Sequence, residues 1–535
     1  MYIHRIIKKT KKKTYKSVLL QRSYRDKIKG PRQETIANLS DWSDKLVDNF
    51  EKLLKGAEIL DAKNLSQILQ TEQGKSYGGI KTVYDLCQRL GINKAINNKR
   101  TRFFTNIIIA GFLNTGKLSK NFIANEWSKL NAIDEVYGKQ PYWNEDDLYE
   151  TLNWLNSNQR KIEKKLFQQK YGKNFKNKII FLYDVTGSYV EGGSIDMSAF
   201  GYQRDGKPGK KQIVIGLMAD NEGDPVCVEV FRGNTLDHKT VASQLNKIKK
   251  EYGLEKVIFV GDRGMIKSSQ IDLITGNNWE YITGITKPQI EKMLKNNTIQ
   301  YSLFDEELCE VKYENIRYIL KRNPIRANEI KDNFHNKINK FEQLLQKKNK
   351  YLKEHKKASV EVAEKHLADY CKLRKLKKAI SITIKDRTFF FSKNEENITD
   401  ILKLAGCYVL KTNVSDKELS KEEVHAGYKN LALIEHGFKK IKTTLINLRP
   451  LFVRKEAHIR GHVFACMLAL KLTLYLEKIL KSLDFTFEYC IESLNSIQTI
   501  NYTFENKSFC RLPDKFSRDN EMILEKLKFN WKKDL

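Results

Sequence analysis

None of the eight cysteines of this 535-residue chain forms a CxxC pair, and none stands beside a histidine at metal-ligand spacing. This absence argues against a zinc finger, which needs such pairs. Cysteines scattered in this way are typical of reduced thiols in a cytosol. We therefore expect a cytoplasmic protein.

The sequence also lacks a long uncharged apolar run. Its N-terminus has basic residues but no apolar segment of the kind found in signal peptides. The most apolar long stretch, 462–480, contains His462, Lys471 and Glu477, so it is predicted to be a buried or amphipathic helix. We expect no association with a membrane.

Acidic residues are scarce relative to basic ones: 65 Asp and Glu stand against 96 Lys and Arg, a formal net charge of +31. Such a charge repels itself unless a polyanion neutralises it, and nucleic acid is the usual polyanion. A low-GC genome explains the preference for Lys over Arg, but not the excess of basic residues. With 41% hydrophobic residues, the chain can build the cores of several domains.

The N-terminal third divides into two predicted regions. Residues 1–34 are a basic arm, with KKTKKK at 8–13, which is either a solvated tail or lies along phosphates. Residues 35–175 are expected to be a helical region for DNA binding and dimerisation. The helix–Gly–helix pattern around Gly91 fits a helix-turn-helix or ordinary bundle packing, and 143–172 predicts an amphipathic helix.

From residue 176 the pattern changes to short apolar runs. Helices are predicted at 241–253 and 268–277, and strands at 179–186, 211–220, 224–233, 256–264 and 281–287. The order β-β-β-α-β-α-β is that of an α/β fold with an RNase H-like catalytic core, a mixed five-stranded sheet with helices. Its first and fourth strands would be neighbours. We assign residues 176–290 to the first part of this core.

The rest of the chain is predicted to interrupt and then complete the core. Residues 291–415 are a Lys-rich insertion with helices and strands, whose centre is either a helical hairpin with a basic face or a partly disordered insert. Residues 416–482 are expected to hold the next core helix and the helix after it. The C-terminal region, 483–535, receives no assignment.

Three acidic residues occupy positions suited to metal binding. Asp184 lies within an apolar strand, where an unpaired carboxylate is costly, Asp262 lies where the fourth strand ends, and Glu435 lies beside the apolar stripe of a helix. Three converging carboxylates can hold two Mg²⁺ or Mn²⁺ ions. Each acid alone also has an ordinary explanation, such as a salt bridge between Asp262 and Arg263.

The helix predicted at 428–445 also offers a face for phosphate contacts. Lys439 and Lys442 follow Glu435 by about one and two helical turns, and Tyr428 precedes it by two, so the four side chains are expected to share one face. The alternative is a solvated charged face.

The segments named above resemble DDE transposases of the IS4 superfamily, and within it the IS1634 group. The resemblance rests on YDVTGSYVEG, FGYQRDGKPGKKQIVIGLM, FRGNTLDHKT, VGDRGM, YITGITK and the stretch from Tyr428 to Phe464. It implies that Asp184, Asp262 and Glu435 are the catalytic triad and bind two Mg²⁺ or Mn²⁺ ions.

The resemblance also implies DNA contacts. The superfamily's Tyr-x2-Arg-x3-Glu-x6-Lys signature falls on Tyr428, Leu431, Glu435 and Lys442. Leu431 replaces the signature's Arg, so Lys439 or Arg449 is expected to supply that phosphate contact. The DNA contacts expected from this region are Arg263, Tyr428, Lys439, Lys442 and Arg449.

The activity implied by the resemblance is cut-and-paste transposition. The enzyme would cleave double-stranded DNA at the inverted-repeat ends of an insertion sequence, act as a homodimer in the synaptic complex, and join 3′-hydroxyl ends to target DNA. One alternative is an RNase H-like metal-dependent nuclease without strand transfer. The other is a non-catalytic, domesticated DNA-binding protein, which predicts erosion of the triad, whereas all three acids are present.

Overall fold

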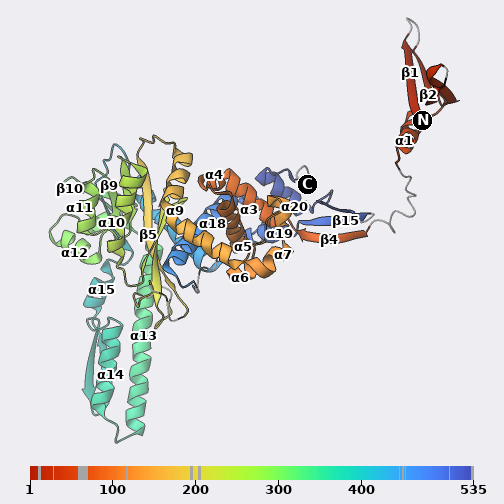
Figure 1. Ribbon diagram of the computed structural model, residues 1–535. Coiled ribbons are helices and arrows are strands. Elements are labelled where there is room, and N and C mark those ends of the chain that lie inside the picture. The colour runs from red at the N-terminus through yellow and green to blue at the C-terminus, as the bar shows by residue number, and fades with distance from the viewer. Residues whose placement is uncertain are drawn as a thin grey trace. The chain divides into compact units, whose positions relative to one another are not determined.

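A computed structural model describes residues 1–9, 14–27, 29–57, 70–115, 119–192, 195, 197–202, 206–444, 446, 448, 451, 453–504 and 507–531. Figure 1 shows its helices and strands. The chain divides into two compact units. The smaller unit comprises Met1–Gly74, Thr499–Pro513 and the last residue; the larger comprises Lys75–Gln498 and Asp514–Asp534.

Antiparallel strands build the smaller unit. β1 (Tyr2–Lys9), β2 (Thr14–Asp26) and β3 (Gly30–Asn38) pair in that order, and α1 is Asp44–Leu54. Their common core is small and consists of Val18, Leu20, Leu39 and Val47. A second sheet has the order β16-β15-β4, with β4 at Gln70–Ser76, β15 at Gln498–Phe504 and β16 at Lys507–Arg511.

The strands at residues 2–38 correct the prediction of a basic arm at 1–34. Most of their side chains are exposed because the sheet covers only a small core, so the apolar–polar alternation that marks a half-buried strand is weak. The predicted helical region also begins later than residue 35, since β3 extends to Asn38 and β4 lies before the first helix of the larger unit.

Helices form the first part of the larger unit. They are α3 (Gly78–Arg89), α4 (Ile92–Ala95), α5 (Lys99–Thr115), α6 (Lys120–Phe122), the π-helix η1 (Ile123–Trp127), α7 (Ser128–Leu130), α8 (Ile133–Tyr137) and α9 (Glu145–Tyr171). The helix predicted at 143–172 coincides with α9, which Asn144 caps and Gly172 ends.

The pattern around Gly91 reflects bundle packing. Gly91 has a φ of 73°, in the left-handed region that favours glycine, and it separates α3 from α4. α4 is a single turn in which Ile92, Asn93 and Ala95 are buried. A helix this short and this buried does not present the exposed face of a recognition helix.

Eight strands form the main sheet, in the order β10-β11-β14-β9-β8-β5-β6-β7. β5 (Ile179–Tyr189), β6 (Gln212–Asp220) and β7 (Pro225–Arg232) are an antiparallel meander, and β8 (Val257–Gly261) runs parallel to both β5 and β9 (Glu280–Gly284). Between them lie α10 (Asp237–Lys247), the π-helix η2 (Ile248–Tyr252) and α11 (Ser268–Thr275). These five strands have the predicted order, which is consistent with an RNase H-like core.

Residues 291–415 enlarge the sheet as well as interrupting it. α12 (Lys287–Lys295) and the 3₁₀-helix η3 (Tyr301–Phe304) precede β10 (Cys309–Tyr313) and β11 (Ile316–Arg322), and β14 (Cys407–Thr412) lies between β11 and β9. The predicted sheet of five strands is therefore smaller than the observed sheet of eight. The sequence could not reveal this, because strands far apart in the chain pair only through the fold.

The middle of the insertion has its own core. α13 (Pro324–Glu354) and α14 (Val360–Leu373) pack with the hairpin of β12 (Ile380–Lys385) and β13 (Thr388–Lys393), followed by α15 (Glu395–Lys403). Figure 1 shows α14 beside α13. Helices therefore form where the sequence left open a helical hairpin or a disordered insert.

The chain then returns to the sheet through α16 (Lys421–Lys429), α17 (Leu431–Lys439), the π-helix η4 (Lys440–Thr444) and α18 (Glu456–Leu480), before α19 (Phe487–Asn495) and α20 (Arg518–Leu527). α18 is largely buried and crosses α9 closely: a Cβ on Gly461 would lie 1.9 Å from the carbonyl oxygen of Leu152. Among the described residues, no helix combines the length and apolarity needed to cross a membrane.

Candidate active site

Asp184 and Asp262 come from adjacent parallel strands. The pairing of β5 with β8 ends with Leu182 opposite Val260, and each aspartate follows its strand's last paired residue by two positions. Side chains two residues apart on a strand point to the same face. The two carboxylates are therefore level with one another, with Asp184 in the middle of β5 and Asp262 just after the end of β8.

The surroundings of Asp184 are those of a rigid strand. Tyr183 and Val185 are buried in the core on the other face of the sheet, while Asp184 itself is half-buried. Its neighbour across the sheet is Leu217 of β6. The apolar sequence of β5 therefore fixes the backbone and leaves one carboxylate on the opposite face.

A turn fixes the orientation of Asp262. Its Oδ1 accepts hydrogen bonds from the backbone N–H groups of Gly264 and Met265, at 2.7 and 2.9 Å. This is the local hydrogen bonding by which Asp stabilises turns. Within the described part of the chain Oδ2 has no hydrogen-bond partner, and the side chain is exposed, so this oxygen can reach a ligand.

Tyr428 of α16 joins the two aspartates. Burial and, after it, the negative charges of Asp262 and Asp184 raise the pKa of Tyr428 to about 12, against the opposing charge of Arg263. The hydroxyl lies near the end of β9, where a Cβ on Gly284 would be 2.9 Å from Tyr428 Oη. The structure thus brings together Asp184, Asp262, Arg263 and Tyr428, as the sequence led us to expect.

Glu435 lies on the helix that covers this face but does not join the pair. α17 packs on β5 and β6, and a Cβ on Gly437 would lie 3.8 Å from Leu217, the neighbour of Asp184. The Glu435 side chain is exposed. Across the described ranges, no three His, Cys, Asp or Glu side chains lie close enough together to hold a metal ion.

The helix predicted at 428–445 is three segments, so the predicted common face is wrong. α16 ends where the Asn430 amide donates to the carbonyl and the Oδ1 of Asn221, at 3.1 and 3.0 Å. After α17 the chain becomes the π-helix η4, whose wider turn changes the angular spacing of side chains. Lys442 is consequently buried, whereas Lys439 is exposed.

One signature position and one predicted DNA contact remain. Leu431, which replaces the superfamily's Arg, is buried and contributes to packing. Arg449 lies outside the residues that the structure describes.

Sequence reasoning missed a hydrogen-bonded pair beside the site. His425 Nε2 and Tyr408 Oη are 2.5 Å apart, and Tyr408 in turn affects the pKa of Tyr428. His425 precedes Tyr428 by three residues, the spacing of neighbours on one helix face. That spacing was the available signal, but Tyr408 comes from β14, which the sequence did not place in the sheet.

Two family models match the chain. The one described as "Transposase DDE domain" matches residues 176–472, which is more than half of the chain. The chain belongs to the DDE transposase family. A second, described as "IS1634 family transposase, N-terminal domain", matches residues 3–67 of this transposase. The resemblance seen in the sequence motifs is thereby confirmed, including the IS1634 group.

Two solved structures are similar to the transposase at low sequence identity. A piggyBac transposase synaptic complex with hairpin DNA is 8% identical, with 78% of this chain and 76% of that chain covered and a TM-score of 0.35. A Mos1 transposase paired-end complex with the left transposon end is 14% identical, with coverages of 45% and 69% and a TM-score of 0.15. No curated protein sequence matches the transposase.

Proposed function

We propose that this transposase cleaves double-stranded DNA at the inverted-repeat ends of an insertion sequence and joins the 3′-hydroxyl ends to target DNA. The observation that carries the proposal is the matching register of Asp184 and Asp262, each two positions beyond the last paired residues of the adjacent parallel strands β5 and β8. A net charge of +31 supports DNA as the partner. The reaction would take place in the bacterial cytoplasm, with a homodimer holding the paired ends.

Asp184, Asp262 and Glu435 are the residues proposed to hold two Mg²⁺ or Mn²⁺ ions. Carboxylate oxygens are the hard ligands that these ions prefer, and Asp262 presents an oxygen already oriented by its turn. When bound, such ions lower the pKa of an attacking water or hydroxyl and stabilise the leaving oxygen. The aspartates are proposed from their matching register on adjacent strands, and Glu435 is proposed from its place on the covering helix.

Arg263 and Tyr428 would position the phosphate beside the carboxylates. Arg263 offers a guanidinium fork suited to phosphate oxygens. Tyr428, with a pKa raised to about 12, stays protonated at neutral pH and can donate a hydrogen bond. Exposed Lys439 would contact the DNA backbone outside the site, whereas buried Lys442 would support the η4 turn. The role of Arg449 as a phosphate contact rests on the resemblance alone.

The test is cleavage of labelled linear DNA that carries the element's own inverted repeats, with Mg²⁺ or with EDTA. We expect Mg²⁺-dependent nicking at the repeat ends by the wild type and its loss in Glu435→Gln, with DNA binding retained. Glu488→Gln, an exposed acid on α19, is the matched control and should cleave normally.

Each other outcome has a defined meaning. Cleavage that Glu435→Gln leaves unchanged would remove Glu435 from the metal site. Nicking without joining to target DNA would favour a nuclease, and binding without any cleavage by the wild type would favour a domesticated DNA-binding protein.

A further inference from the structure

A pocket of about 410 Å³ lies in the helical part of the larger unit, among α3, α5, α8 and the turn before α9. None of the candidate active-site residues lines it. Six of its fifteen lining residues are aromatic, four are basic and none is acidic. Its volume falls within the range of small-ligand sites, roughly 300–1,000 Å³.

The rings of the pocket form a connected wall. Trp143 contacts Phe104 and Phe103 with ring centroids 5.6 and 6.1 Å apart, Phe103 contacts Tyr137 at 5.2 Å, and Tyr137 contacts Tyr84 at 5.2 Å. The interplanar angles of these four pairs lie between 67° and 89°, so none of them is stacked. Edge-to-face contacts are favourable in themselves, so these rings hold one another in a fixed aromatic wall.

Two buried polar atoms on lining residues make no hydrogen bond of regular geometry within the described part of the chain, although the two side chains lie near one another. They are Asn106 Oδ1 and Tyr137 Oη, and Asn106 is fully buried with its amide nitrogen donating to Asn93 Oδ1 at 3.0 Å. An unsatisfied buried polar atom costs about 1–3 kcal/mol. Burial raises the pKa of Tyr137, so its hydroxyl stays protonated.

The basic residues make the pocket attractive to an anion. Lys99 and Lys139 are exposed, and neither has an ion-pair partner among the residues that the structure describes. Arg100 pairs with Asp147 and lies over the ring of Phe104, with its guanidinium carbon 5.6 Å from the ring centroid. A phosphate at the rim would therefore meet two lysines and no carboxylate of the lining.

We propose that this pocket binds one unpaired nucleotide of a DNA strand. The base would stack on Trp143 and Tyr142, with the phosphate on the rim lysines. Aromatic rings among cations are characteristic of single-strand sites, because the faces of unstacked bases are open. The inference rests on the proposed function only in taking DNA as the polynucleotide.

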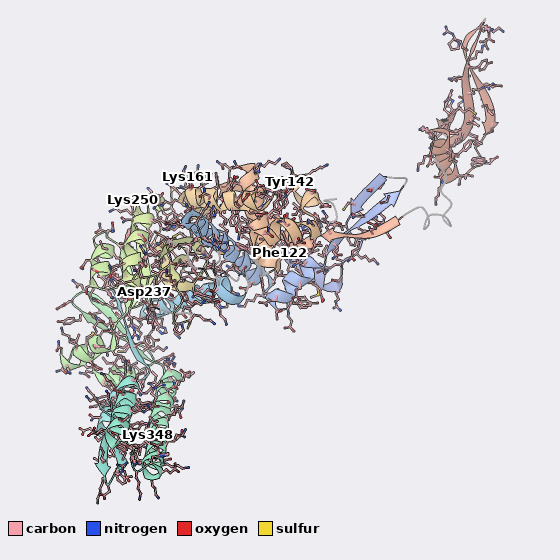
Figure 2. The ribbon with its side chains drawn as sticks, turned by 60° about the horizontal axis from the view of Figure 1, so that its bottom comes forward. Phe122, Tyr142, Lys161, Asp237, Lys250 and Lys348 are labelled. Atoms are coloured by element: carbon pink, nitrogen blue, oxygen red, sulfur yellow. The ribbon has the colours of Figure 1, made fainter. Side chains whose placement is uncertain are left out.

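The test uses the full-length protein and a duplex with a short overhang that contains one 2-aminopurine, compared with a blunt duplex of equal length, both in EDTA. Tyr142→Ala is the main variant, since Tyr142 is 89% exposed and its loss leaves the core intact (Figure 2). We expect the wild type to prefer the overhang and quench its fluorescence. Tyr142→Ala should weaken overhang binding on the order of tenfold and leave blunt binding unchanged.

Matched variants and a competitor complete the design. Tyr142→Phe should keep the preference, and Lys139→Ala should reduce it, whereas Lys161→Ala removes an exposed charge from α9 outside the pocket (Figure 2) and should affect both duplexes alike. Equal binding of overhang and blunt duplex by the wild type, or an overhang affinity that Tyr142→Ala does not change, would overturn the proposal. So would free dAMP that binds as tightly as the overhang, because the site would then serve free nucleotides.

The two proposals fail separately. EDTA prevents cleavage in the binding experiment, so an inactive catalytic site leaves the preference for an overhang intact. Loss of that preference leaves Mg²⁺-dependent nicking in place.

Discussion

The two candidate DNA sites of the larger unit are built from opposite materials. Asp184 is held within β5 of the sheet, and Asp262 is held by a hydrogen-bonded turn just after β8. The pocket of α3, α5 and α8 has rings and cations and no acidic lining residue. The pair of aspartates needs bound metal cations before it can accept a phosphate, whereas the basic pocket attracts a phosphate directly. In the two proposals the reaction chemistry and the binding of an unpaired strand are therefore assigned to separate parts of the fold.

One helix connects the elements of both sites. α9 begins two residues after Trp143 of the pocket, and its 27 residues span about 40 Å. Near its other end, Lys170 pairs with Asp220 at 2.6 Å and Asp224 at 2.8 Å, in the turn between β6 and β7. Lys471 of α18 binds Asp224 as well, at 2.6 Å. The sheet and the pocket are thus fixed to the same rigid rod.

The largest expected effect belongs to Asp262→Asn. This change keeps the shape of the side chain and removes its charge, so end cleavage should fall on the order of 10³-fold, while the overhang preference of the pocket stays unchanged. Single-turnover cleavage rates and binding curves measure the two readouts. Asp484→Asn, an exposed acid after α18, should behave as wild type. Full cleavage by Asp262→Asn would remove the acidic site from the reaction.

A contrast between buried and exposed strands explains which parts of the fold were predictable. All nine residues of β6 are buried, and β8 is buried throughout, so both appear in the sequence as unbroken apolar runs. β3 has no buried residue, and its sequence looks like that of a solvated arm. A strand that buries little surface carries little of the pattern by which strands are recognised.

The candidate sites were likewise predictable only where the local sequence carries a clear pattern. Asp184 and Asp262 were found because a carboxylate in or beside an apolar strand is conspicuous. The segmentation of the helix carrying Glu435 was not predicted, because the break depends on Asn430 meeting Asn221, a contact between distant segments. The pocket was also missed, since its residues between Tyr84 and Trp143 form no motif, and an unsatisfied Asn106 is visible only once its neighbours are placed.

The next largest effect tests the junction between α9 and α18. Gly461→Ala would place a Cβ 1.9 Å from the carbonyl oxygen of Leu152, so the helices must move apart, at about 1–3 kcal/mol of unfolding free energy. Cleavage and overhang binding should both decline, unlike in Asp262→Asn. Urea denaturation measures the stability. Gly427→Ala, whose Cβ would make an ordinary 3.6 Å contact, is the control, and equal stability of the two variants would contradict this account.

A smaller effect is expected from Tyr428→Phe. Removing the hydroxyl deletes one proposed hydrogen bond to a charged phosphate, so the cleavage rate should fall on the order of tenfold with stability and pocket binding unchanged. The pKa of Tyr428 is raised to about 12, so its hydroxyl does not titrate between pH 7 and 9. The ratio of wild-type to variant rates should therefore be constant across that range. Tyr313→Phe, an exposed tyrosine on β10, should cleave normally.

The smallest expected effect concerns stability in acid, through the ion pair of Asp220 with Lys170 near the end of α9. Burial alone raises the pKa of the Asp220 carboxyl, but hydrogen bonds from Lys170 and Tyr171, at 2.6 and 2.5 Å, outweigh burial and hold the pKa below its usual value. The unfolded chain therefore takes up this proton first.

The contribution of Asp220 to stability is thus complete above the unfolded-state pKa, about 3.9, and is lost as the pH falls through the lower folded-state value. We expect Asp220→Asn to lower stability at pH 7 and to show a shallower loss between pH 5 and pH 3 than the wild type. One titrating group limits the difference in slope to about 1.4 kcal/mol per pH unit. Denaturation curves at each pH measure it, with Asp484→Asn as the control. If the stability of wild type and of Asp220→Asn fell in parallel with pH, the charge of Asp220 would not help to fix α9. The close crossing of α9 and α18 at Gly461 would then be the contact that fixes this helix.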